Sequence, residues 1–271
     1  MIRLPAVAGM FYPKTIEAIE EQISRFDVGD ATPQPALGVV APHAGYQYSG
    51  LVAAKVYSRI APQGPVILIG PNHKSGMFTG APLVAIMAEG VWEMPGGDVE
   101  VDAALASLIM EETDLPANDP KAHENEHSLE TQIPLLTHYC GEVKIVPIIM
   151  ARIPDSALAS LAEGIYRAIK RSGASATLVA SSDFSHHVTA KTAERLDLMA
   201  IERIEALDAS GLLEVVRGEN ISMCGVQPTA VVLDVCKRLG ATSAELIEYK
   251  TSGDTTGDYR SVVGYGGLII R

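Results

Sequence analysis

Four short apolar runs rich in β-branched residues most constrain the fold of this chain. They occupy residues 36–41, 65–70, 143–150 and 176–180. Runs of this length and composition predict strands that are buried on both faces, as in a mostly parallel sheet. Helical patterns lie between and after these runs, at residues 49–60, 102–112, 128–139, 155–173, 192–207 and 227–239. The alternation predicts one α/β domain over residues 1–271, with a mixed, mostly parallel central sheet and helices on both faces.

Local signals refine this prediction at several boundaries. Ser49 and Asp102 are good N-caps for the helices that follow them, and Gly173 is typical of a helix end. The segment 81–102 alternates in polarity around glycines, which predicts a hairpin inserted in the series. The runs 244–251 and 261–270 flank a turn rich in Gly, Asp and Thr, so we expect them to pair at one edge of the sheet.

Charge and cysteine content exclude several classes of protein. The 271 residues include 33 acidic and 21 basic ones, giving a formal net charge of −12 without a basic cluster. This balance argues against a nucleic-acid or anionic-membrane partner. Three cysteines cannot form a disulfide framework and indicate a reducing compartment. No apolar run is long enough to span a membrane, and Pro5 and Gly9 interrupt the N-terminal run, so we expect a soluble, cytoplasmic protein without a signal peptide.

Histidines follow the predicted strands at equivalent places. His43 lies two residues after the first run and His73 three residues after the second. The segment after the fourth run contains Asp183, His186 and His187. A single loop histidine is usually just a solvated turn residue. Three strand ends that each carry one favour a shared pocket, because ligands of open α/β sheets bind outside the carboxyl ends of the strands.

The chemistry of such a pocket depends on which residue joins the two imidazoles as a third metal ligand. Neutral imidazole suits Fe, Cu and Zn, and two imidazoles with one anionic ligand leave positions open for a substrate. Cys224 stands directly before a predicted helix, whose dipole should lower the pKa of the thiol and favour a metal-binding thiolate. The alternative is a small buried apolar residue, as we expect for Cys140 and Cys236. Position alone leaves both readings of Cys224 open.

The stretch "HENEH" at residues 123–127 matches the H-E-x-x-H pattern of zinc hydrolases. That pattern requires both histidines on one helix, whereas the apolar spacing begins a helix near His127 or Ser128, after a loop. We therefore expect the match to be coincidental. Glu126, His127 and Glu130 then either border the pocket or cap the helix, and the sequence leaves this open, as it does for His187.

Six motifs in order carry a resemblance to a known family. They are "LPAVAGMFYP", "APHAGYQYSG", "GPNHK", "ENEHSLETQIPLL", "SSDFSHH" and "MCGVQP". The chain resembles the Memo family, whose prokaryotic members are also called AmmeMemoRadiSam system protein B. The resemblance extends from near the N-terminus to about residue 230. It implies a fold related to class III extradiol dioxygenases, in which two His and one Glu hold a non-haem Fe(II).

The resemblance also implies roles for individual residues. The Memo pattern replaces the carboxylate ligand by cysteine, so His43, His73 and Cys224 fall at the metal positions. His186 falls at the position of a catalytic acid/base histidine, with Asp183 as its neighbour in the pocket. The implied cofactor is Fe(II), with Cu or Zn as alternatives. The family name further implies AMMECR1-like and radical SAM proteins as partners in a modification pathway.

Three functional hypotheses follow. The first is a metal-dependent redox enzyme in which His186 moves protons. The second is a binding module that holds a peptide or small-molecule ligand in the same pocket without turnover. The third, which the position of "HENEH" disfavours, is a metal-dependent hydrolase.

Overall fold

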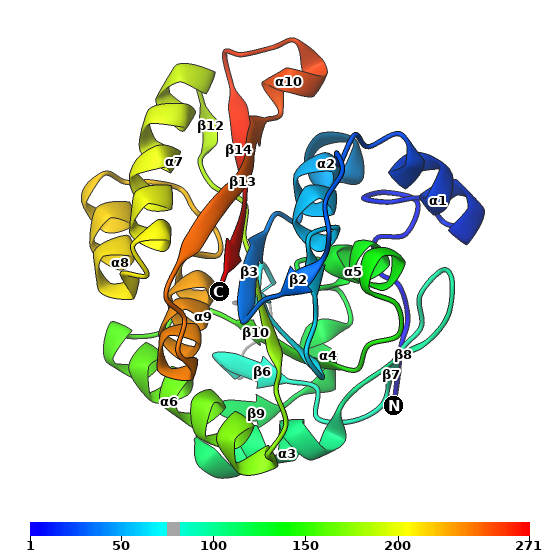
Figure 1. Ribbon diagram of the computed structural model, residues 1–271, viewed down its shortest axis with the longest axis vertical. Helices are drawn as coiled ribbons and strands as arrows, with labels where there is room; N and C mark the ends of the chain where they lie inside the picture. Colours follow the sequence, from blue (N-terminus) through cyan, green and yellow to red (C-terminus); the bar gives the residue numbers. More distant parts are fainter. Residues whose placement is uncertain (75–81) are drawn as a thin grey trace.

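A computed structural model describes residues 1–74 and 82–271. Within these residues the central sheet has nine strands (Figure 1). Its order is β12 (His186–Val188), β14 (Val262–Ile270), β3 (Gly38–Ala41), β11 (Thr177–Ser181), β5 (Val66–Pro71), β10 (Ile145–Met150), β6 (Val84–Ile86) and β9 (Pro116–Asn118), with β13 (Ala244–Thr251) paired to β14. The strands β3, β11, β5 and β10 are mutually parallel, and they are the four strands that the apolar runs predict.

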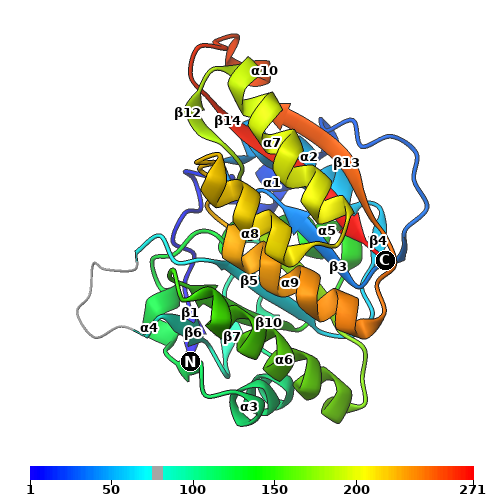
Figure 2. The ribbon, with the colours of Figure 1, turned by 90° about the vertical axis from the view of Figure 1, so that its left-hand side faces the viewer.

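The two faces of the sheet carry separate hydrophobic cores, because side chains alternate along each strand. On β5, Val66 and Leu68 belong to one core and Ile67 and Ile69 to the other. The first core is covered by α1 (Ile16–Ser24), α2 (Tyr46–Tyr57) and α5 (Ile133–Cys140). The second is covered by α3 (Ala103–Glu112), α6 (Asp155–Ser172), α7 (Ala190–Glu205), α8 (Ala209–Gly218) and α9 (Val226–Leu239), of which α6, α8 and α9 lie side by side in Figure 2.

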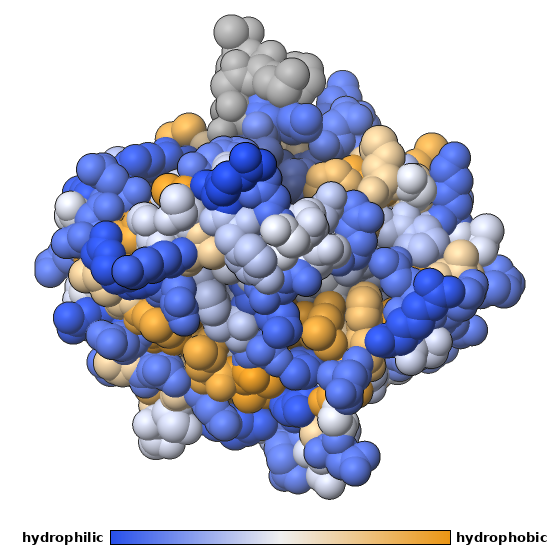
Figure 3. Space-filling model, turned by 90° about the horizontal axis from the view of Figure 1, so that it is seen from above, coloured by the Kyte–Doolittle hydropathy of each residue, from blue (hydrophilic) through white to orange (hydrophobic). Residues whose placement is uncertain are grey.

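Small elements complete the fold. A second sheet joins β1 (Ile2–Arg3), β7 (Val91–Trp92) and β8 (Val99–Glu100), and a third pairs β2 (Gln34–Pro35) with β4 (Ile60–Ala61). The short helices are α4 (Pro120–His123), the 3₁₀ turn η1 (Glu130–Gln132) and α10 (Gly253–Thr256). Seen from above, the surface is mainly hydrophilic, and apolar residues form patches between the polar ones (Figure 3). In the described part of the chain, no helix has the length and apolar character that crossing a membrane requires.

Several local predictions are confirmed. The Asp102 carboxylate accepts the Leu105 N–H at 2.9 Å and caps α3. Gly173 ends α6 in the left-handed conformation, with φ of 70°. The strands β13 and β14 pair antiparallel at one side of the sheet, as the two C-terminal runs predict.

Other boundaries differ from the predictions. Ser49 is not the N-cap of α2, which begins at Tyr46 because the Tyr46 N–H finds an acceptor in the Phe11 carbonyl, at 2.7 Å. The predicted helix 128–139 is divided into η1 and α5. The predicted hairpin segment begins at residue 81, outside the described residues; its strand β6 joins the central sheet, and only β7 and β8 form a hairpin. The predicted elements do not include β9, α4 or α8.

A close approach at Gly225 fixes where α9 begins relative to β11. A Cβ atom on Gly225 would lie 2.4 Å from the Ser181 carbonyl oxygen and 2.5 Å from Ser182 Cβ. The Gly225 N–H also donates to Ser182 Oγ at 3.0 Å. Only glycine fits this contact between backbones. The contact places Cys224, the residue before it, next to the end of β11.

We predict that Gly225→Ala lowers the free energy of unfolding by about 1–3 kcal/mol, because overpacking forces the helix away from the strand. Gly218→Ala is the matched control, since nothing lies within 4 Å of a Cβ at that position in α8. We expect it to raise the free energy of unfolding by about 0.4–1 kcal/mol, by restricting the unfolded chain. Urea denaturation followed by circular dichroism measures both. A Gly225→Ala variant as stable as the wild type would contradict the close approach.

Candidate metal centre

The carboxyl ends of the parallel strands place three polar side chains at one edge of the sheet. His43, His73 and Asp183 are each the second residue after their strand, following β3, β5 and β11. The register pairs Ser181 of β11 with Ala41 of β3, so Asp183 and His43 emerge side by side. The His43 N–H donates to Asp183 Oδ1 at 2.8 Å, which ties the two loops together.

Three imidazoles meet at this edge. The rings of His43, His73 and His127 each offer one nitrogen, and these nitrogens all lie within 4.8 Å of one another. The ring centroids of His43 and His73 are 5.2 Å apart, and His127 stacks on His73 at 4.5 Å. This cluster could hold a metal ion. Two of its members are predicted ligands, whereas the sequence leaves open whether the third, His127, borders the pocket.

Hydrogen bonds determine which nitrogen of His43 is free. Its Nδ1 lies 2.9 Å from Ser181 Oγ. The single Ser181 hydroxyl proton goes to the Ser128 carbonyl at 2.6 Å, and Ser181 Oγ accepts from Gln132 Nε2 at 2.8 Å. Because a serine hydroxyl has only one proton, His43 Nδ1 must donate, so the neutral ring leaves the Nε2 lone pair unprotonated and free to bind a metal.

His73 is oriented in the same sense by a buried carboxylate. Its Nδ1 donates to Glu126 Oε1 at 2.9 Å, and its backbone N–H donates to Glu126 Oε2. The N–H groups of His127 and Ser128 also donate to Glu126 Oε1, at 2.9 Å and 2.8 Å. A carboxylate that binds the outer nitrogen of a histidine fixes its tautomer and strengthens the opposite nitrogen as a ligand.

Ionisation states at the cluster suit metal binding. Burial lowers the pKa of His43 well below its ordinary value, and the neighbouring imidazoles lower it further. Burial also lowers the pKa of His127. Burial by itself raises the pKa of Glu126, but the hydrogen bond from His73 and the nearby imidazoles outweigh it and bring the pKa to about 2. At neutral pH the site therefore combines neutral imidazoles at His43 and His127 with a carboxylate behind them.

Cys224 lies beside this cluster. Its Sγ is 3.3 Å from His43 Nε2, and it accepts the Asp183 N–H at 3.3 Å. The expectation of a lowered thiol pKa is wrong for the metal-free protein: burial raises the pKa of Cys224, and the charge of Asp183 raises it further. Burial likewise raises the pKa of Cys140 and Cys236, so a helix N-terminus does not distinguish Cys224. Its place as a metal ligand stays a prediction.

Asp183 lies in the loop after β11, and His186 is the first residue of β12, which follows that loop. Burial raises the pKa of the Asp183 carboxyl, against the lowering effect of the His43 N–H and of nearby imidazoles. His186 Nδ1 donates to the Ser222 carbonyl at 2.9 Å, which leaves its Nε2 free to take or give a proton. Electrostatic interaction with His186 lowers the pKa of both His43 and Asp183, but less than other effects do. His187 is exposed, with φ of 60°. The catalytic role of His186 and Asp183 stays a prediction.

The "HENEH" stretch does not form the helical hydrolase motif. Helix α4 ends at His123, and His127 lies in the following loop. His123 is buried, its Nδ1 bonds to the Asp119 carbonyl at 3.1 Å, and its ring packs on Trp92. Among the described residues the cluster that could hold a metal includes His127 but not His123. The stretch thus supplies one imidazole, that of His127, to the cluster. The feature of the sequence that could have indicated this is the Glu126–His127 pair, which belongs to no predicted helix.

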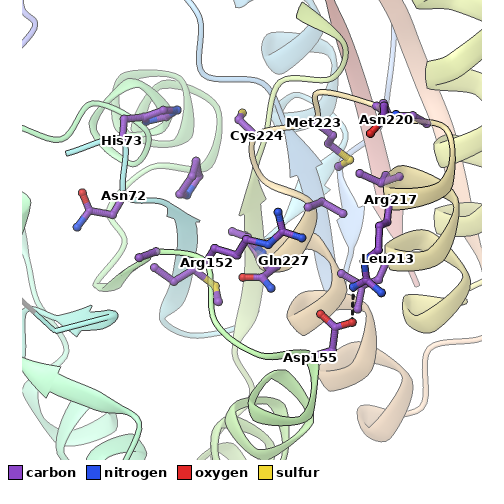
Figure 4. A pocket seen from close by; sticks show the side chains of 17 residues that line it. Asn72, His73, Arg152, Asp155, Leu213, Arg217, Asn220, Met223, Cys224 and Gln227 are labelled. Atoms are coloured by element: carbon purple, nitrogen blue, oxygen red, sulfur yellow. Dashed lines mark hydrogen bonds and ion pairs between the residues drawn. The ribbon is translucent and has the colours of Figure 1, made fainter. Parts of the chain in front are cut away.

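A cavity of about 480 Å³ opens beside the cluster (Figure 4). His73 and Cys224 stand on one of its walls. The opposite wall is formed by α8 and by the start of α6, which contribute Leu213, Arg217 and Asp155. A small molecule in this cavity would therefore lie against the candidate metal ligands.

The N-terminal segment holds the loop that carries Glu126 and His127. Arg3 donates to the carbonyls of His123 and Glu126, at 3.0 Å and 2.8 Å, and pairs with Glu130 at 2.6 Å. Both side chains of the Arg3–Glu130 pair are at most 1% exposed. Glu130 also accepts the Tyr12 hydroxyl at 2.6 Å. Glu130 therefore supports the loop from behind and does not face the imidazoles.

We predict that Arg3→Met lowers the free energy of unfolding by about 3–5 kcal/mol, because it leaves the Glu130 carboxylate buried without its partner. Arg25→Met is the matched control: Arg25 pairs with Glu21 on α1, and both side chains are more than half exposed. Removing an exposed pair costs at most about 1 kcal/mol. Guanidinium denaturation measures both variants. Equal, small losses would show that the buried pair does not secure the loop.

The chain is similar to known proteins over nearly its whole length. The model of the Memo-like protein family matches residues 3–269. A MEMO1 family protein of Methanopyrus kandleri is 40% identical over 285 residues, covering 100% of this chain and 99% of that protein. One of Pyrobaculum aerophilum is 42% identical over 281 residues, covering 99% of both.

A solved structure shares the fold. It is an uncharacterized protein of Escherichia coli K12, with a TM-score of 0.56 and 12% identity, covering 86% of this chain and 98% of that chain. At this identity the likeness concerns the fold alone. The relatives and the family match, which extend over nearly the whole length, establish that this chain belongs to the Memo family.

Proposed function

We propose that the protein binds a first-row transition metal at His43, His73 and His127, with Cys224 as a further ligand, for a redox reaction on a small molecule. One observation carries the proposal. The Nδ1 atoms of His43 and His73 are both committed to hydrogen bonds, so Nε2 is the nitrogen of each ring that can bind a metal beside a third imidazole. An arrangement of this kind is typical of metal-binding histidines.

The donor set selects the class of metal. Neutral imidazole and thiol sulfur suit Fe(II), Cu and Zn, whereas Mg and Ca prefer oxygen ligands. We propose Fe(II) first, with Cu and Zn as alternatives. Fe(II) or Cu would supply redox chemistry and Lewis acidity when bound. Metal binding would also oppose the effect of burial on the Cys224 thiol, since a coordinating thiol is deprotonated.

The chain's own residues supply the proton chemistry in this proposal. His186 Nε2, left free by the bond from Nδ1 to Ser222, accepts a proton from the substrate or returns one. Asp183 orients the loop of His43 and can hold a proton at its buried carboxyl. The proposed reaction class is that of an oxidoreductase related to class III extradiol dioxygenases. A shared pathway with AMMECR1-like and radical SAM proteins also belongs to the proposal, and it rests on the family resemblance.

A binding module is the second candidate, and the cavity beside His73 and Cys224 is the observation that favours it. Such a module would hold a peptide or small molecule there without turnover. Metal stoichiometry separates the two candidates, because only the first requires a metal in the cluster.

We predict that the protein, loaded under nitrogen and desalted, retains about one equivalent of Fe(II), Zn(II) or Cu(I) per chain. His43→Ala and His127→Ala should each lower metal affinity by more than the roughly 10–100-fold that loss of an outer hydrogen-bond partner causes. His138→Ala, at an exposed histidine outside the cluster, should bind as the wild type does. Elemental analysis and competition with a chelator measure these affinities. Less than a tenth of an equivalent retained would leave the binding module as the better candidate.

Glu126→Gln tests the outer shell separately. The amide keeps the shape of the side chain but loses the charge that strengthens His73, so metal affinity should fall by about 10–100-fold. Glu124→Gln, an exposed change on the same loop, should leave the affinity unchanged. Calorimetric titration with Zn(II) under identical buffer conditions compares the two. Equal affinities for both variants would mean that Glu126 only shapes the loop.

A further inference from the structure

The fourth parallel strand, β10, is followed by an arginine at the position where the other three strands are followed by residues of the candidate site. His43, His73 and Asp183 are each the second residue after β3, β5 and β11, and Arg152 is the second residue after β10. The register pairs Met150 with the last residue of β5, so Arg152 and His73 leave the sheet from adjacent places. The same edge therefore presents a cation next to the imidazoles.

Arg152 projects into the cavity that His73 and Cys224 border. In Figure 4 its side chain extends into the middle of the cavity, between His73 on one side and Arg217 on the other. The two arginines differ in their partners. Arg217 is neutralised by Asp155, at 2.5 Å. Arg152 is exposed and takes part in none of the ion pairs that the described residues form, so its charge is uncompensated.

A neighbouring glutamine holds the backbone of this arginine in place. Gln227 is buried, and its amide makes two hydrogen bonds to Ile153, accepting from the N–H at 3.0 Å and donating to the carbonyl at 2.7 Å. The loop after β10 is thereby fixed to the first turns of α9. The Arg152 side chain thus starts from an anchored backbone, which lowers the entropic cost of using it to bind a ligand.

The wall of the cavity also has an apolar part, beside polar residues such as Asn72 and Asn220. The lining includes Met150, Leu213, Val216, Met223 and Val226. Apolar walls with a few polar groups that fix orientation are typical of small-molecule sites. A ligand that matches both parts has an apolar body and one anionic end.

We propose that Arg152 binds the carboxylate of a small amphipathic acid whose apolar body fills this cavity and reaches the wall formed by His73 and Cys224. The assignment of this acid as a substrate rests on the proposed function, whereas its binding does not. A forked guanidinium matches a carboxylate with two parallel hydrogen bonds. One uncompensated cation also matches one negative charge better than the two of a phosphate monoester. In a protein of net charge −12, an unpaired cation inside a cavity selects for anions.

The test uses metal-free protein with ¹³C-labelled methionine methyl groups at pH 8, well above the ordinary pKa of histidine. Met150 and Met223 line the cavity, and Met10 is an exposed reference elsewhere. The probes are 4-phenylbutyrate and its neutral amide, which share one apolar body. We expect both to shift the Met150 and Met223 signals but not that of Met10. The carboxylate should bind at least about fivefold more tightly than the amide, because its hydrogen bonds are charge-assisted.

Variants assign the preference to Arg152. Arg152→Met should reduce the carboxylate-to-amide ratio to about one while leaving amide binding unchanged, and Arg152→Lys should keep part of the ratio, because it keeps the charge without the fork. Arg167→Met removes an exposed arginine of α6 that does not line the cavity, and it should behave as the wild type does. Inorganic phosphate should shift neither methionine below the concentration at which the carboxylate saturates.

Three results would overturn the inference. They are equal affinities for carboxylate and amide in the wild type, a preference that survives in Arg152→Met, and no shift at Met150 and Met223 with either probe at any concentration up to its solubility limit. Tighter binding of phosphate than of the carboxylate would assign Arg152 to phosphorylated ligands instead and would overturn the carboxylate. Because no metal is present in the test, failure of metal binding and failure of this inference are separate outcomes.

Discussion

The parallel register of β3, β11, β5 and β10 is the constraint on which the rest of the structure depends. Parallel strands end at the same edge of a sheet, so the loops that follow them converge in one crevice. In this chain the second residue after each of these strands has a titratable or charged side chain: His43, Asp183, His73 and Arg152. A shift of one residue in any strand would turn its buried side chains to the opposite face. The two hydrophobic cores therefore secure the position of these residues within the sheet.

Buried ionised side chains orient the loop that carries His127 and the ring of His73, which apolar packing alone would not do. Glu126 receives its hydrogen bonds from the backbone or ring of His73, His127 and Ser128, and this network aligns two of the three imidazoles. Arg3 in turn binds the carbonyl of Glu126 and the carboxylate of Glu130. Such groups cost free energy to bury and have few ways to be satisfied, so they specify a single arrangement of an irregular loop. The imidazole nitrogens of His43, His73 and His127 lie within a few ångströms of one another only if the loop keeps this one arrangement. The buried groups therefore contribute more to the geometry of the cluster than to the free energy of unfolding.

The elements that the sequence predicts correctly are those with a strong local signal. The four parallel strands, the Asp102 cap and the Gly173 terminus are all set by residues within a few positions of one another. The alternation of strands and helices likewise predicts that His43 and His73 share an edge. The prediction of Ser49 as an N-cap is wrong because the start of α2 depends on the carbonyl of Phe11, a residue distant in sequence.

The rest of the site depends on contacts between distant segments. His127 joins the cluster from a loop whose shape is set by Arg3, and no local pattern announces that contact. The pKa of Cys224 could not be predicted from its place before α9, because burial and the nearby Asp183 carboxylate, which raise it, come from a distant segment of the chain. Arg152 belongs to no motif that the sequence reveals. Its position becomes informative only when β10 is known to lie beside β5.

The place of β3 within the sheet has a consequence for how the protein is made. This strand, which delivers His43, pairs with β11 on one side and β14 on the other. His43 is separated by 140 residues from Asp183 and by 181 from Cys224. Because chains are synthesised from the N-terminus, His43 is made long before Asp183 and Cys224, two residues that it contacts in the folded protein. Contacts of such long range also form slowly. The full set of proposed ligands, Cys224 among them, therefore exists only after the chain has been synthesised beyond that residue.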